Sequence, residues 1–182
     1  LPLKIASHPR TLLQETKLAL RIDPRRIDVT QESEVTVRFG STDYLDVEIP
    51  SALVGRWEIE SSGVTTRTEQ STTATGPRIY RIGLSAELER EARLRFHYDL
   101  PLPRPLEAGG TLEAEVPWIR LADESRKLAP ARLQCEVDPA LSAELVGPGW
   151  SIDEDRDGNG PNATPVGSRT STLFLKAPAS TE

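Results

Sequence analysis

The sequence predicts an all-β protein: an antiparallel β-sandwich, built either as one elongated unit or as two packed sandwich-like halves. Apolar and polar residues alternate in several short segments of the 182 residues, which is the pattern of a strand with one buried and one wetted face. Segments rich in glycine, proline, serine and aspartate separate these strands. Sustained apolar stripes of helical period are missing, so helix is expected to be a minor component.

The alternation is clearest in four segments, residues 17–22, 34–39, 44–49 and 93–99. In the last of them, one face carries the apolar side chains Leu94, Phe96 and Tyr98. The other face carries Arg93, Arg95, His97 and Asp99. Because successive side chains of a strand point to opposite faces, we expect the first set to be buried and the two arginines to be exposed.

Further strands are predicted at residues 56–60, 64–69, 78–84, 111–116, 132–137, 143–146 and 170–175. A helical turn or two is predicted at each of residues 11–15, 85–90 and 123–128. Short strands at such close spacing, without a crossover helix long enough for parallel pairing, favour a β-sandwich.

A proline-rich connection divides the chain. Residues 101–110 contain three prolines followed by Gly109-Gly110, and proline donates no ladder hydrogen bond. We therefore expect a β-sandwich unit at residues 1–100 and a second β unit at residues 111–182, which either stands alone or shares a core with the first. A faint similarity between residues 51–60 and 142–153 fits two related units, or a strand–Gly–Trp corner that arose twice.

The charge balance excludes some partners. There are 22 basic and 28 acidic residues, a net charge of −6, whereas nucleic-acid binding needs a cationic surface, so nucleic acid is not an expected partner. Apolar stretches stay far below the ~20 residues of a membrane-spanning helix, so no direct membrane insertion of this segment is expected. The single cysteine excludes an internal disulfide.

An acidic segment near the C-terminus matches half of a calcium loop. Its candidate metal ligands are Asp153, Asp155, Asp157 and Asn159. The three aspartates stand at positions 1, 3 and 5, and Gly158 at position 6 permits the sharp turn that wraps oxygens around Ca²⁺. Thr164 stands at position 12, where the pattern needs a bidentate glutamate. Two interpretations stay open, namely a weak Ca²⁺ site or a solvated acidic turn partly neutralised by Arg156.

For the other candidate residues, a structural role and a functional role are both open. Arg93, Arg95 and His97 form either an anion- or sugar-binding stripe or a plain charged sheet face. Trp57, Trp118 and Trp150 are core anchors or a carbohydrate platform. Trp57 alternates with Ile59 and is expected inside. Cys135 lies on the apolar side of its strand and is expected to be a buried, inert thiol.

Catalytic motifs are not recognised. The sequence has no Gly-x-Ser-x-Gly elbow and no phosphate-binding glycine loop. We therefore expect no enzyme; the rival hypothesis is an enzyme whose acidic residues come together from distant strands.

Residues 80–84 (Tyr-Arg-Ile-Gly-Leu) and 93–103 resemble β-rich segments of large, uncharacterised bacterial exported or membrane-anchored proteins. The resemblance covers about a quarter of the chain and rests on strand patterns. It implies an extracytoplasmic module and carries over no functional residue.

Together these observations predict a non-catalytic structural or interaction module of a larger bacterial envelope or exported protein, located outside the cytoplasm or in the cell envelope. The first residue is Leu1, which agrees with a piece of a longer protein. The expected partner is an unknown protein or a polysaccharide. The alternative is a calcium-stabilised adhesion or carbohydrate-binding module that uses the Asp153-Asp155-Asp157 loop. No cofactor other than Ca²⁺ is expected.

Overall fold

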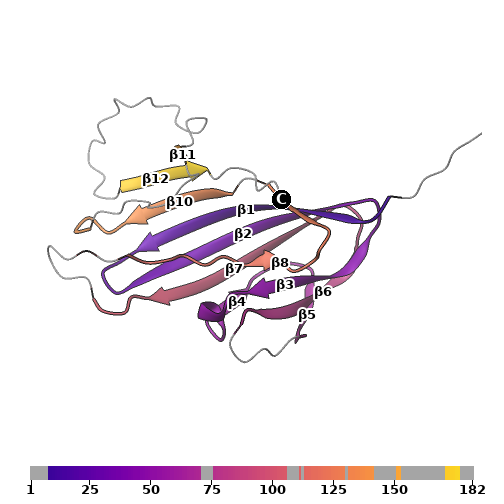
Figure 1. Ribbon diagram of the computed structural model, residues 1–182, viewed down its shortest axis with the longest axis horizontal. Helices are drawn as coiled ribbons and strands as arrows, with labels where there is room; N and C mark the ends of the chain where they lie inside the picture. Colours follow the sequence, from indigo (N-terminus) through magenta and orange to yellow (C-terminus); the bar gives the residue numbers. More distant parts are fainter. Residues whose placement is uncertain are drawn as a thin grey trace, which may run out of the picture.

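The computed structural model folds into two β-sheets, and the prediction of an all-β, sandwich-like fold is confirmed (Figure 1). The structure describes residues 8–70, 76–105, 111, 113–129 and 131–141, together with the backbone of residues 151–152 and 171–176. Within these residues, no helix has the length and apolar character needed to cross a bilayer.

The large sheet has the strand order β11-β12-β10-β1-β2-β7-β4, with β9 also paired to β1. Its strands are β1 (Thr11–Ile22), β2 (Arg26–Arg38), β4 (Trp57–Ile59), β7 (Glu91–Pro101), β9 (Arg126–Leu128), β10 (Arg132–Val137), β11 (Ser151–Ile152) and β12 (Ser171–Lys176). β9 and β10 run parallel to β1, and the other pairs are antiparallel.

The small sheet has the order β5-β6-β3-β8. Its strands are β3 (Thr42–Ile49), β5 (Val64–Glu69), β6 (Arg78–Leu88) and β8 (Arg120–Leu121), and a 3₁₀ turn, η1 (Ser51–Leu53), follows β3. The chain passes between the sheets from β2 to β3 and again from β6 to β7, at the same end of the molecule (Figure 1). The first passage turns through left-handed backbone at Phe39 (φ 60°) and Gly40 (φ 139°).

The core fills the space between the two sheets. Its fully buried apolar side chains come from both sheets and include Val35, Leu45, Val47, Ile49, Ile82, Phe96, Ile119 and Leu121. The expected faces of residues 93–99 are confirmed: Leu94, Phe96 and Tyr98 are buried, and Arg93 and Arg95 are exposed. The long strands therefore show the half-wetted alternation of an antiparallel sheet.

A pair of buried glutamines holds the small sheet to the large one. Gln31 on β2 accepts a hydrogen bond from the Ile119 N–H (2.8 Å) and donates one to the Ile119 carbonyl (2.6 Å). Gln14 on β1 accepts from the Leu121 N–H (2.9 Å). Because β8 pairs with β3 on its other side, these two side chains, the glutamine pair, take the place of a neighbouring strand. They satisfy backbone groups that burial would otherwise leave unpaired.

Several sequence predictions need correction. The helical turns predicted at residues 11–15, 85–90 and 123–128 are wrong: these residues lie mostly in β1, β6 and β9 or in the turns beside them. Residues 111 and 113–116 lie outside any strand, so the strand predicted at 111–116 is also wrong. The predicted strands 64–69 and 132–137 coincide with β5 and β10. Residues 143–146 lie outside the described residues.

β5 forms one rim of the small sheet. Arg67 stands opposite the buried Ile82 and so points to the inner side of β5. Its guanidinium lies 4.6 Å from the centroid of the Trp57 ring, which places a cation–π contact between the rims of the two sheets. A glycine is needed at position 83 on β6, because a Cβ there would clash with the Thr66 hydroxyl of the neighbouring strand.

A turn at Asp123 links the segment after β8 to the start of the chain. The Asp123 carboxylate accepts hydrogen bonds from the Ser125 N–H (2.8 Å) and hydroxyl (2.6 Å) and pairs with Arg10 (2.7 Å). Burial alone would raise the pKa of Asp123, but the Ser125 hydrogen bonds and the Arg10 cation outweigh burial and lower it below 3.8.

We expect Asp123→Asn to lower the free energy of unfolding by about 1–2 kcal/mol near neutral pH, since it removes the charge from these hydrogen bonds. Because the pKa of Asp123 is lower in the folded than in the unfolded protein, its charge stabilises the fold at pH values above the unfolded-state pKa. This contribution is lost as the pH falls through the folded-state pKa. Urea unfolding at about pH 7 and about pH 2 should therefore show the difference between variant and wild type shrinking in acid. An equal difference at both pH values would contradict this account.

Candidate functional site

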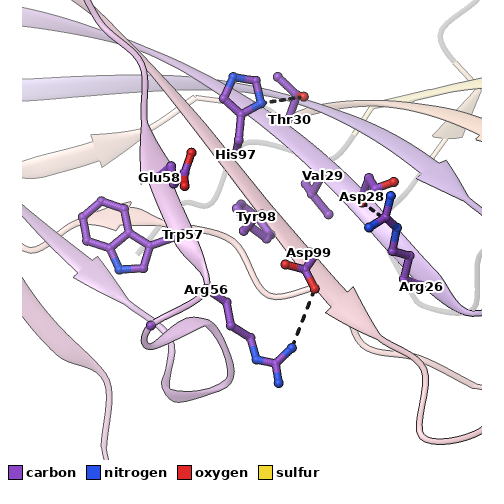
Figure 2. Close-up of a pocket in the computed structure, with 11 residues that line it drawn as sticks. Arg26, Asp28, Val29, Thr30, Arg56, Trp57, Glu58, His97, Tyr98 and Asp99 are labelled. Atoms are coloured by element: carbon purple, nitrogen blue, oxygen red, sulfur yellow. Dashed lines mark hydrogen bonds and ion pairs between the residues drawn. The ribbon is translucent and has the colours of Figure 1, made fainter.

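A hollow lies on the outer face of the large sheet, where β2, β7 and β4 run side by side (Figure 2). Its volume is about 480 Å³, and it is open to solvent. Its polar lining consists of Arg26, Asp28, Thr30, Arg56, Glu58, His97 and Asp99. The hollow is therefore a charged depression on a sheet face and not an apolar pocket.

Strand alternation and register place these side chains together. Thr30 on β2 lies opposite His97 on β7, which in turn lies opposite Glu58 on β4. Asp28 lies opposite Asp99 one step further along the same strands. Every second residue of a strand faces outward, so residues from three strands form cross-strand rows on one face.

His97 joins two neighbours across the sheet. Its Nδ1 lies 3.2 Å from the Thr30 hydroxyl, as Figure 2 shows, and its Nε2 lies 3.1 Å from a Glu60 carboxylate oxygen. A hydroxyl, an imidazole and a carboxylate in this order match the arrangement that activates a nucleophile.

Two features of the surroundings weaken this arrangement as a catalytic group. β2 is paired along both edges at Thr30, with Ala19 on β1 and His97 on β7. The backbone N–H of Thr30 is therefore used in the β-ladder and does not stabilise an oxyanion beside the Thr30 hydroxyl. The Glu60 side chain is 74% exposed, so water screens its interaction with the imidazole.

Four charged residues of the hollow, two aspartates and two arginines, pair with one another. Asp28 and Asp99 face each other across the β2–β7 pair, an arrangement that is unfavourable between like charges. Arg26 pairs with Asp28 at 3.2 Å, and Arg56 pairs with Asp99 at 3.7 Å (Figure 2). Each aspartate thus has its own cation, and both arginines stay about half exposed.

The predicted stripe of Arg93, Arg95 and His97 does lie on the outer face of β7, but its cations are paired. Arg95 contacts Glu32, and Arg93 lies 3.5 Å from Glu34 and 3.4 Å from Glu91. An anion would have to compete with these carboxylates. The structure therefore favours the interpretation of an ordinary charged sheet face.

The described tryptophans and the cysteine follow their core interpretation. Trp57 is 6% exposed, and its ring is turned away from His97 in Figure 2. Trp118 is partly buried against the core, and Trp150 lies outside the described residues. Cys135 is buried, and burial, with a smaller effect of the Glu136 charge, raises the pKa of its thiol. It is thus unsuited to act as a thiolate nucleophile.

The predicted calcium ligands Asp153, Asp155, Asp157 and Asn159 lie outside the described residues, so the metal site stays a prediction. Within the described part of the chain, no group of three or more histidine, cysteine, aspartate or glutamate side chains is arranged to hold a metal ion.

We expect Ca²⁺ at about 1–10 mM to raise the melting temperature if the loop binds it with the weak affinity of extracellular modules. At a tenfold excess over Kd, the gain is about 1.4 kcal/mol. Differential scanning calorimetry of wild type and Asp155→Ala, each with Ca²⁺ or with Mg²⁺, measures it. An unchanged melting temperature, or an equal rise in Asp155→Ala, would remove the calcium hypothesis.

Sequence reasoning found His97 but missed its neighbours. Residues 26–33 were not predicted as a strand, because Gln31 and Ser33 stand where apolar residues were expected. Ile27 and Val29 do alternate with Asp28 and Thr30. Accepting buried polar residues would have placed Asp28 and Thr30 on the outer face.

No protein-family model matches the sequence, and a comparison with curated proteins gives no match. Among solved structures, the chain is similar to an M1 zinc metallopeptidase from Deinococcus radiodurans bound to a Tyr-Ser-Ala substrate, with 14% identity and a TM-score of 0.46. It is also similar to a two-domain M1 zinc metallopeptidase bound to L-tryptophan, with 13% identity and a TM-score of 0.45. Each alignment covers 92% of this chain but 39% of the peptidase. The chain thus spans about two fifths of those proteins, and the likeness is weak.

Proposed function

We propose that this chain is a non-catalytic β-sandwich module of a larger bacterial envelope or exported protein, and that it binds a protein partner through the outer face of its large sheet. The observation that carries the proposal is the row of alternating charges across that face. Lys17 on β1 lies opposite Glu32 on β2, which lies opposite Arg95 on β7. Charges held in such rows suit a complementary protein surface, where they determine register and specificity.

A protein suits this face better than a polysaccharide. Sugar rings usually stack on exposed aromatic faces, and the Trp57 ring beside the hollow is 6% exposed and turned away from it (Figure 2). Trp57 and Tyr98 also line the hollow, but both are buried, and its polar lining consists of two arginines, three carboxylates, a histidine and a threonine. Charged groups of this kind complement oppositely charged groups on another protein.

The non-catalytic part of the proposal is tested with an activated ester. The purified chain, His97→Ala and Thr30→Val are each incubated with p-nitrophenyl acetate. We expect the three proteins to hydrolyse it at the same low rate, because the Thr30 backbone N–H is used in the β-ladder and does not stabilise an oxyanion. Turnover that both substitutions abolish would overturn the proposal and establish Thr30 as a nucleophile.

The binding face is tested by site-specific photo-crosslinking. A photo-crosslinking amino acid is placed at Glu58, in the hollow, in the full-length protein made by its own cells. The matched control carries it at Thr68, an exposed position on β5 of the small sheet. We expect a protein adduct from the first position only, lost when Arg95→Glu reverses a charge in the row. An adduct with polysaccharide, or equal adducts from both positions, would contradict a protein-binding face.

The location is tested by fractionating the same cells. We expect the full-length protein in the envelope or the medium; recovery in the cytosol alone would overturn that part of the proposal.

A further inference from the structure

We propose that the protein partner of this chain contributes an extended segment, which lies in a groove across the outer face of the large sheet. The segment carries charged residues in the order basic-x-acidic-x-x-x-basic, where x is any residue. This inference rests on the proposed function, because it specifies which part of a protein the outer face binds.

The groove consists of the hollow in Figure 2 and a second, smaller hollow beside it. The second hollow has a volume of about 280 Å³ and lies where β1 and β10 end and β2 begins. Arg26 and Asp28, both labelled in Figure 2, line the two hollows alike, so the hollows adjoin. Together they cross β10, β1, β2, β7 and β4. At the usual strand spacing this is a distance of about 19 Å.

Three charged side chains of the groove are available to a partner. Arg21 on β1 and Glu136 on β10 line the second hollow, and Glu58 on β4 lines the first. All three are exposed, and their side chains form no ion pair or hydrogen bond within the described part of the chain. The two arginines and two aspartates between them pair with one another. A partner therefore complements the three unpaired charges without breaking an existing ion pair.

The strand register determines the spacing of these three charges. Arg21 lies opposite Glu136 on the neighbouring strand, about 5 Å away, and Glu58 lies three strands from Arg21, about 14 Å away. An extended chain advances about 3.4 Å per residue and turns alternate side chains to one face. A segment that crosses the strands thus meets Glu136 and Arg21 with residues two apart. Its residue four positions further on meets Glu58.

The size of the groove favours an extended segment over a helix. The volumes of the hollows are about 480 and 280 Å³. Spread along the groove, they give a mean cross-section of about 40 Å², close to that of one extended chain between its neighbours in packed sheets. A helix with its side chains is about 10–12 Å in diameter and needs about twice this cross-section.

Synthetic peptides test the charge order on the full chain. The probe is a fluorescein-labelled peptide that contains Lys-Thr-Glu-Thr-Ser-Thr-Lys, and its control has the same composition in the order Lys-Lys-Glu-Thr-Thr-Ser-Thr. We expect fluorescence anisotropy to show tighter binding of the first peptide. The measurement is made at about 20 mM salt, because salt screens exposed charges. Equal binding of the two peptides, or no binding of either, overturns the proposal.

Charge reversal at Arg21 tests the position of the acidic residue. Arg21→Glu should weaken binding of the ordered peptide about fivefold, the upper value for one exposed ion pair. A peptide with lysine in place of its glutamate should instead bind Arg21→Glu more tightly than wild type. The matched control is Arg38→Glu, an exposed position at the other end of β2, which changes the net charge of the protein equally. Equal effects of the two reversals would show a response to net charge alone and overturn the proposal.

Photo-crosslinking separates this inference from the proposed function. In the full-length protein made by its own cells, the crosslinking amino acid is placed either at Glu58 or at Pro139, an exposed, uncharged residue of the second hollow. We expect both positions to capture one segment of one partner, at residues within about eight of each other. Capture of distant segments, or capture from Glu58 alone, overturns the extended segment and leaves the protein-binding face standing. No protein adduct from either position overturns both.

Discussion

Replacing Phe96 with alanine should lower the free energy of unfolding by roughly 3–5 kcal/mol, the usual cost of truncating a large, fully buried aromatic side chain. Phe96 is 1% exposed, on β7, which lies between β2 and the edge strand β4 of the large sheet. Its ring lies 6.1 Å from the Trp57 ring, centroid to centroid, and it sits between Gln31 on β2 and Ile59 on β4 in the strand register. The cavity left by alanine would therefore border several rigid neighbours, which restricts relaxation.

Chemical denaturation monitored by tryptophan fluorescence measures this effect. The matched control is Arg95→Ala, one residue earlier on the outer face, which should change stability by less than about 1 kcal/mol. A one-residue slip of β7 would exchange the two faces. A small cost for Phe96→Ala together with a large one for Arg95→Ala would therefore reverse the register described here.

Replacing Gln31 with leucine should cost about 2–4 kcal/mol, although leucine is more apolar and of similar size. The Gln31 side chain is fully buried and serves both the N–H and the carbonyl of Ile119. Leucine would leave the buried N–H without a partner, at about 1–3 kcal/mol for each such group. The carbonyl would keep only the longer hydrogen bond from Gln14, at 3.3 Å.

The matched control is the same substitution at Gln134, which lies between the inward-facing Leu133 and Cys135 and so faces outward on β10. We expect Gln134→Leu to stay within about 0.5 kcal/mol of wild type, as most surface substitutions do. Hydrogen exchange gives a second, local measurement, since the Ile119 amide should lose protection in Gln31→Leu. A stabilising effect of leucine at position 31 would show that the glutamine pair does not hold β8.

Sequence reasoning recovered the strands whose inward positions are apolar, such as the one that carries Leu94 and Phe96. It failed where inward positions are polar. The first half of β1 was not predicted as a strand because Gln14 and Thr16 are at its inward positions. The first half of β2 was missed because Gln31 and Ser33 are at inward positions there. The alternation itself persists there, but the two glutamines bond to the backbone of Ile119, more than 80 residues away along the chain. The pattern of residues within one strand does not reveal a hydrogen-bond partner that lies so far along the chain.

The candidate site was foreseen only in part for the same reason. The outward direction of His97 follows from alternation, and the structure confirms it. The neighbours Thr30, Glu58 and Glu60 depend on which strands lie beside β7, and that order is a property of the whole sheet. The predicted strand at residues 111–116 failed because residues 111 and 113–116 pair with neither sheet, and in this part of the chain Arg120–Leu121 pairs with β3.

The position of Arg67 bears on how the protein behaves when it is concentrated. β5 is rich in threonine, a residue favoured in strands, and among the described residues it pairs along one edge only, with β6. An inward-pointing charge on an edge strand opposes pairing with another chain, so Arg67, held over Trp57, is expected to protect this rim from association between chains.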